Sequence, residues 1–213
     1  MRKLLTIVVA AVFLAFASAA SAQTVLTANI TNDQEPGNVT PTTATGGTRT
    51  SSGTAVFTIS PAMDSITFTS TVLGLDLTGT QTADPNDDLL NAHIHISDDP
   101  NFMPPAAAGV RWGFFGAPFN ETAPNDQVVV PLTAGVGGTI SGKWDATEGN
   151  GTTLAPWIDD ILAGRAYINF HTTQFPGGEI RGAIIPEPTT MALAGLGFVL
   201  FGAVALNRRG KKA

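Results

Sequence analysis

The sequence predicts an all-β fold: an antiparallel β-sandwich or barrel-like domain with one short helix, flanked by an N-terminal signal peptide and a C-terminal transmembrane helix. Three observations lead to this prediction. Short runs of alternating apolar and polar residues recur through the middle of the chain, which is typical of half-buried strands. Gly, Thr, Pro and Asn dominate the segments between these runs. An uncharged apolar stretch lies near each end.

The N-terminal stretch has the three parts of a secretory signal. Arg2 and Lys3 are followed by the apolar segment Leu4–Ala17, and the A-x-A sequence at residues 20–22 precedes Gln23. This pattern predicts that signal peptidase removes residues 1–22 and that the mature chain is exported. The fold must therefore come from residues 23–185, which is enough chain for one domain.

Eight segments of this domain fit β-strands. In Ser65–Val72, Ile66, Phe68 and Val72 share one face, and serine and threonines occupy the other. The predicted strands are Val25–Ile30, Thr54–Ser60, Ser65–Val72, Ala92–Ser97, Val128–Leu132, Thr139–Trp144, Arg165–His171 and Glu179–Ile185. The aromatic segment Val110–Phe115 is either a further, buried strand or an exposed contact patch. Many short strands with turn residues between them indicate an antiparallel sandwich or barrel.

One helix interrupts the strands, and one long loop follows the first of them. Pro156 suits a first helical position, apolar residues from Trp157 to Leu162 recur at helical spacing, and Gly164 can end the helix. Gln34–Ser52 is rich in Thr, Gly, Pro and Asn and is predicted to be a loop.

Charge and cysteine content limit the partners and the means of stabilisation. Residues 23–185 hold five basic against sixteen acidic side chains, a net charge of −11. Nucleic acid and anionic lipid are therefore not expected as partners of the domain, because phosphate binding needs positive charge. The chain has no cysteine, so an exported domain of this sequence must be stable through its core alone.

The last 28 residues, 186–213, combine three features. A Pro186-Glu187-Pro188 motif precedes the uncharged segment 190–206, which would be about 25 Å long as a helix, a minimal transmembrane span. The basic residues that follow should stay cytoplasmic: Arg208, Arg209, Lys211 and Lys212. This tail resembles the PEP-CTERM sorting signal of exported bacterial proteins. The resemblance implies an exosortase-type protease that recognises the motif and cuts the tail; an uncut C-terminal membrane anchor is the alternative.

Strand geometry predicts a polar patch on three of the strands. In Ala92–Ile96, His93 and His95 lie on the face opposite the isoleucines, because successive side chains of a strand alternate. The same alternation puts Tyr167, Asn169 and His171 together on a later strand, and Glu179 and Arg181, as a plausible ion pair, on the last. If these strands are neighbours, the seven side chains converge.

Two interpretations of this patch stay open. His93, His95 and His171 could bind zinc or copper, which favour imidazole ligands. Alternatively, the histidines belong to a structural network of hydrogen bonds that fixes the strand register. From the sequence alone we favour the network, and so expect no cofactor, with zinc or copper as the alternative.

The residues around the patch resemble a known family. They read His-x-His at 93–95, then Gly-Arg-Ala-Tyr-x-Asn-x-His-Thr from Gly164, then Phe-Pro-Gly-Gly-Glu-Ile-Arg-Gly from Phe175. Residues 24–184 thereby resemble a CHRD domain, the chordin-type module. The resemblance implies an extracellular module without shared catalytic activity, with a protein or polysaccharide ligand. With the tail, it implies a membrane-anchored intermediate in a bacterial envelope that ends at the cell surface or in an extracellular matrix.

A metal-dependent enzyme is the second functional class. A β-sandwich with His-x-His is similar to copper/zinc superoxide dismutase, but only as an analogy of fold. That family needs more histidines than the three in this chain and a disulfide that this chain cannot form. We therefore expect a non-enzymatic binding or structural module, with a metal-binding protein as the alternative.

Overall fold

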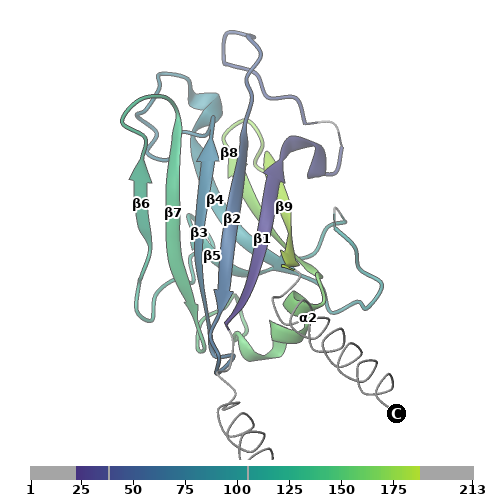
Figure 1. Cartoon of the computed structure of the whole chain (residues 1–213). Coiled ribbons are helices and arrows are strands. Elements are labelled where there is room, and N and C mark those ends of the chain that lie inside the picture. The colour runs from purple at the N-terminus through teal and green to yellow at the C-terminus, as the bar shows by residue number, and fades with distance from the viewer. Residues whose placement is uncertain (1–22, 38, 105, 188–213) are drawn as a thin grey trace, which may run out of the picture.

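Nine strands form one antiparallel sheet in the order β5-β4-β8-β9-β1-β2-β3-β7-β6. In this computed structural model the sheet curls into a half-barrel (Figure 1), and residues 23–37, 39–104 and 106–187 are described. The all-β antiparallel prediction is confirmed, in the form of one continuous curled sheet. The strands are β1 Thr24–Thr31, β2 Ser52–Ile59, β3 Ser65–Leu73, β4 Leu89–Ile96, β5 Gly109–Phe115, β6 Val128–Pro131, β7 Gly137–Asp145, β8 Ala166–Thr172 and β9 Ile180–Pro186.

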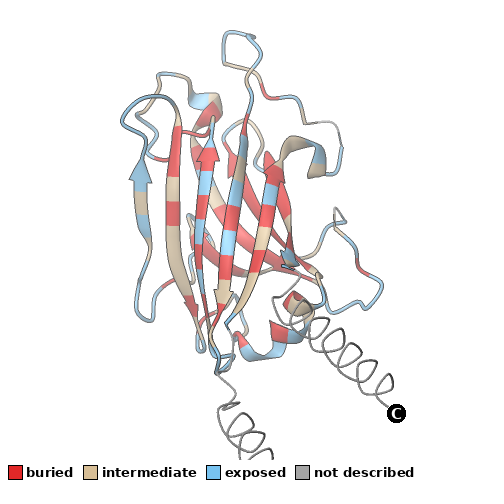
Figure 2. Cartoon of the chain, viewed as in Figure 1, coloured by how far each residue is buried: buried red, intermediate tan, exposed pale blue. Residues whose placement is uncertain are grey.

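The alternation predicted from the sequence orients the front strands. In β3, Ile66, Phe68, Ser70 and Val72 are buried and the residues between them are half-buried or exposed. Figure 2 shows the same alternation of buried and exposed residues along β1, β2 and β3. β8 differs, because all seven of its residues are buried. Its inner face joins the core, and loops cover its outer face.

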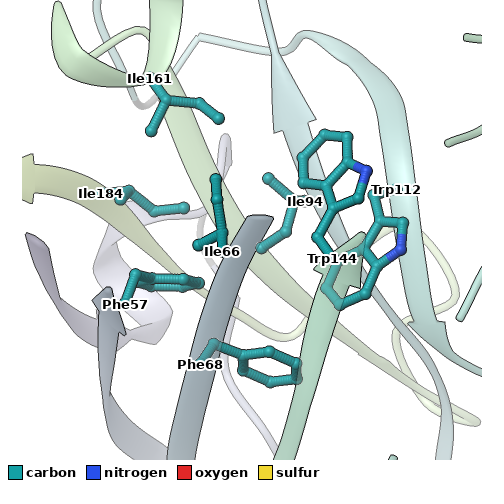
Figure 3. Close-up of a pocket in the computed structure, with 8 residues that line it drawn as sticks. All are labelled: Phe57, Ile66, Phe68, Ile94, Trp112, Trp144, Ile161 and Ile184. Carbon is teal, nitrogen blue, oxygen red and sulfur yellow. The ribbon is translucent and has the colours of Figure 1, made fainter. Parts of the chain in front are cut away.

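Aromatic side chains fill the space between the two ends of the curled sheet. Trp112 of β5 stacks on Trp144 of β7 with ring centroids 5.4 Å apart, and Phe68 of β3 packs edge-on against Trp112. The segment 110–115 is therefore a buried strand and not an exposed contact patch. Figure 3 shows these rings among the apolar side chains around a void of about 10 Å³. That space admits roughly one water molecule, so it is part of the core packing and not a ligand pocket.

One short helix lies at the lower end of the sheet in Figure 1. The 3-10 turn η3, Ala155–Trp157, leads into α2, Ile158–Leu162. Ile158 and Ile161 are buried in the core. The prediction of a helix here is confirmed, but its first turn, at Pro156, is 3-10. Two further 3-10 turns of the same length, η1 Asn32–Gln34 and η2 Pro85–Asp87, lie in the loops.

The sorting motif starts inside the last strand. Pro186 is the final residue of β9, paired with Leu26 of β1, and the backbone N–H of Glu187 donates to the carbonyl of Val25. The predicted signal peptide, transmembrane segment and basic end lie outside the described residues. Within the described part of the chain, no helix has the length and hydropathy needed to cross a bilayer.

Candidate functional site

The three histidines of the chain meet on the outer face of β4 and β8. These strands are neighbours, and His93 lies opposite Asn169 while His95 lies opposite Tyr167. The ring centroids of His93 and His171 are 5.0 Å apart, and those of His93 and His95 are 5.9 Å apart. One nitrogen from each ring lies within 4.8 Å of the other two. The three side chains, called the histidine cluster below, are thus within reach of one ion.

Backbone carbonyls from three different loops fix the orientation of the rings. His93 Nε2 lies 3.0 Å from the Ala117 carbonyl oxygen, His95 Nδ1 lies 2.9 Å from that of Ala108, and His171 Nδ1 lies 2.9 Å from that of Pro176. A carbonyl oxygen can only accept, so each of these nitrogens carries the proton and donates. The second nitrogen of each neutral ring therefore presents a lone pair.

These second nitrogens have no hydrogen-bond partner among the described residues. They are Nδ1 of His93 and Nε2 of His95 and His171, and each is shielded from solvent. Burial lowers the pKa of His93 and of His95 to about 4, and it also lowers the pKa of His171. The cluster therefore consists of neutral rings at neutral pH. Leaving a buried acceptor without a donor costs about 1–3 kcal/mol, so three in one place require an explanation.

The side chains of Tyr167 and Arg181 pack next to the histidine cluster. The Tyr167 ring stacks on His95 at 4.7 Å, and the Arg181 guanidinium lies 4.3 Å from the centre of the Tyr167 ring. The Tyr167 hydroxyl accepts a hydrogen bond from the Ala108 backbone N–H. Because Ala108 also supplies the carbonyl for His95, Tyr167 positions both the ring and its partner. Arranging a ligand through groups that do not touch the ion is characteristic of metal sites.

The predicted Glu179–Arg181 pair does not form. Arg181 binds Glu35, whose carboxylate oxygen is 2.7 Å away, and Glu179 binds Arg49 at 2.6 Å. The alternation assumed for this segment fails because β9 begins only at Ile180. Glu179 instead accepts a hydrogen bond from Thr172, whose side chain lies on the opposite face of β8 from His171. Glu179 is therefore not part of the patch.

Asn169 lies beside the histidines, opposite His93 on the neighbouring strand. It is 1 % exposed, and its side-chain Oδ1 makes no hydrogen bond within the described residues. It lies between Tyr167 and His171 on the same face of β8. The structure thus brings together six of the seven patch residues predicted from the sequence, all but Glu179. Glu35 and the three carbonyls were not predicted from the sequence. Glu35 gave no signal, since it is 146 residues from Arg181.

Two further clusters of carboxylates are buried, apart from the half-buried Asp88. Asp76, Asp87 and Asp88 offer oxygens within 4.8 Å of one another. Asp76 accepts hydrogen bonds from the backbone N–H groups of Thr78 and Thr82, so it organises a turn. In the second cluster, Glu121 and Glu148 anchor the loop after β5 by accepting hydrogen bonds from its backbone N–H groups. Burial raises the pKa of Glu121 to about 7.

Comparison with known proteins agrees with both resemblances. The family model of the CHRD domain matches residues 26–184, and that of the PEP-CTERM protein-sorting motif matches residues 185–209. No curated protein and no solved structure matches the chain. The CHRD match covers all nine strands except the first two residues of β1 and the last two of β9. The chain therefore belongs to the CHRD domain family and carries a PEP-CTERM motif that indicates exosortase-dependent sorting to the envelope.

Proposed function

We propose that this protein is an exported, non-enzymatic module of the bacterial cell surface that binds one zinc or copper ion through His93, His95 and His171. A CHRD domain suggests a binding or structural role, and the sorting motif directs it to the envelope. One observation carries the metal-binding part of the proposal: three buried imidazoles lie within reach of one ion, each donates one N–H to a backbone carbonyl, and the second nitrogen of each has no partner among the described residues.

A structural network explains this arrangement less well. Networks are stabilising when every buried donor and acceptor is satisfied. In the histidine cluster the three unpartnered nitrogens are all acceptors, and none of the described residues supplies a donor to any of them. A cation that accepts the three lone pairs satisfies all three buried nitrogens at once. Zinc and copper are the biological ions that favour imidazole nitrogen.

The burial of the cluster favours binding without turnover. A catalytic metal site keeps one coordination position open to water or substrate. The three histidines are only 4–8 % exposed, and loops bearing Ala108, Ala117 and Pro176 lie over them. We therefore propose a closed site that holds an ion and stabilises the surface module, while a protein or polysaccharide ligand binds elsewhere on the domain.

Metal content of the full-length protein tests the proposal. The protein would be extracted in detergent and purified through a tag without histidine, because the chain's three histidines are all in the cluster. We expect about one zinc or copper ion per chain, lost in the His93→Ala/His95→Ala variant. The control is Asp87→Asn/Asp88→Asn, which alters the acidic cluster and should retain the ion. Metal kept in the histidine variant and lost in the control would refute the assignment.

Fractionation tests the sorting part. Deleting residues 186–213 should move the protein from the membrane fraction to the soluble exported fraction, because the deletion removes the motif and the predicted span together. Replacing Arg208, Arg209, Lys211 and Lys212 should impair orientation and retention of the tail without unfolding the domain. Unchanged membrane retention after the deletion would show that the tail is not the anchor.

A further inference from the structure

The charge around the histidine cluster discriminates between ions. All three ligands are neutral imidazoles, and no carboxylate of the described residues joins them at this point. Arg181, which lies over the Tyr167 ring, is paired with the Glu35 carboxylate at 2.7 Å. An ion in this site thus enters a buried environment in which the described residues offer no anionic ligand. The cost of burying an ion by itself rises with the square of its charge in a Born description. A dication therefore costs about four times as much as a monocation here.

The number of ligands also favours a monovalent ion. Zinc in proteins is almost always four-coordinate, with water as the fourth ligand where only three side chains bind. The unpartnered nitrogens of the cluster are shielded from solvent, and no fourth His, Cys, Asp or Glu of the described residues joins the three histidines. Imidazole nitrogens suit copper, and Cu(I) is monovalent and stable with three ligands.

We infer that the histidine cluster selects monovalent copper, Cu(I), over divalent zinc. This inference rests on the proposed function, namely that the three histidines bind a metal. Charge and coordination number both favour the monovalent ion, and they do so independently. Ag(I), which is also monovalent and does not change oxidation state in air, should bind in the same way.

Competition titrations on the full-length protein in detergent test the inference. Cu(I) would be titrated without oxygen against a bicinchoninate chelator, Ag(I) in air, and Zn(II) against a chromogenic zinc chelator. We expect one Cu(I) or Ag(I) per chain, with a dissociation constant at least tenfold below that for Zn(II), and no binding to the His93→Ala/His95→Ala variant. If zinc binds as tightly as Cu(I), the inference is wrong and the proposed function stands. If none of the three ions binds, both are wrong.

A single substitution tests the charge argument separately from the argument based on the number of ligands. Asn169→Asp changes an amide to a carboxylate of the same size, directly opposite His93 on the neighbouring strand. The added negative charge should favour the dication, so the ratio of zinc affinity to Cu(I) affinity should rise about tenfold or more. Circular dichroism would check that the variant is folded, and the wild-type titration decides the inference if it is not. An unchanged ratio in a folded variant would remove the electrostatic argument.

Discussion

Substituting His171 with leucine distinguishes a metal site from a structural network by stability alone. His171 donates one hydrogen bond, to the carbonyl of the exposed residue Pro176, and its other nitrogen is a buried acceptor without a donor. Losing the hydrogen bond costs about 0.5–1.5 kcal/mol, whereas removing an unsatisfied buried acceptor returns about 1–3 kcal/mol. In the metal-free protein, His171→Leu should therefore change the free energy of unfolding by between about −0.5 and +2.5 kcal/mol, which is close to neutral or stabilising.

Bound metal should stabilise the wild-type protein but not the His171→Leu variant. An ion supplied at 100 times its dissociation constant stabilises the wild-type protein by about 2.7 kcal/mol. For a domain of this size, 1 kcal/mol shifts Tm by about 2–4 °C, so the wild-type protein should gain about 5–10 °C and the variant almost nothing. Tryptophan fluorescence can follow the melting, because all three tryptophans of the chain, at 112, 144 and 157, lie in the described domain.

Thr172→Val is the matched control. Thr172 is the next residue of β8, it is fully buried, and its hydroxyl donates to Glu179 and accepts from the Phe175 N–H. The control should lose about 1–3 kcal/mol and still respond to metal like the wild-type protein. If instead His171→Leu costs more than about 3 kcal/mol without metal, and no ion stabilises the wild-type protein, the histidines are a structural network.

Three further predictions follow from other parts of the structure. A Cβ at Gly113 would lie 1.8 Å from a loop carbonyl oxygen and 3.0 Å from the His93 ring, so Gly113→Ala should weaken metal binding at least tenfold. The control is Gly177→Ala, whose Cβ would meet no neighbouring atom and should leave metal binding unchanged. Equal titration curves for the two variants would contradict this prediction. Burial raises the pKa of Glu121 from 4.5 to about 7, so its stability contribution is complete below the unfolded value and is lost as pH rises through about 7. Urea unfolding should therefore give Glu121→Gln a flatter stability profile than the wild-type protein between about pH 5 and 8, and parallel profiles would be evidence against this effect. The pairing of Pro186 with β1 should restrict access of the protease to the motif. A flexible linker of about six residues between Ile185 and Pro186 should separate the motif from β1 and increase the cleaved fraction in an exosortase-containing host, measured by immunoblot. A smaller cleaved fraction would contradict this reasoning.

Sequence patterns predicted the strands well because burial on one face of a sheet imposes alternation. That is why Ile94 and Ile96 could be assigned to the core, and His93 and His95 to the opposite face, from the amino-acid pattern alone. The prediction that His171 joins them also needed β4 and β8 to be neighbours, although 69 residues separate the two strands in the chain. Periodicity carries no information about which strands pair, so convergence of the patch could be predicted only on the condition that these strands are adjacent.

Alternation fails where the backbone is not extended. Glu179 follows Gly178, which has φ of +126°, and a side chain at Gly178 would lie 2.5 Å from the Glu35 carboxylate. The regular alternation of β9 therefore cannot be extended back through this turn, and the predicted partner of Arg181 was wrong. The loop carbonyls that orient the histidines were unpredictable for a related reason. Every residue has a carbonyl, so only the folded path of a loop determines which one faces a ring.

The absence of cysteine gives the proposed ion a structural purpose. Small exported domains often add disulfides because they restrict the unfolded chain, and this chain has none. The histidine cluster joins two strands, and its rings are tied to the loops that carry Ala108, Ala117 and Pro176. An ion bound by all three rings would hold these loops on the outer face of β4 and β8, since metal-binding free energy adds directly to folding free energy. In the proposed function, the ion therefore acts as the cross-link of a cysteine-free surface module, which explains a buried site without an open coordination position.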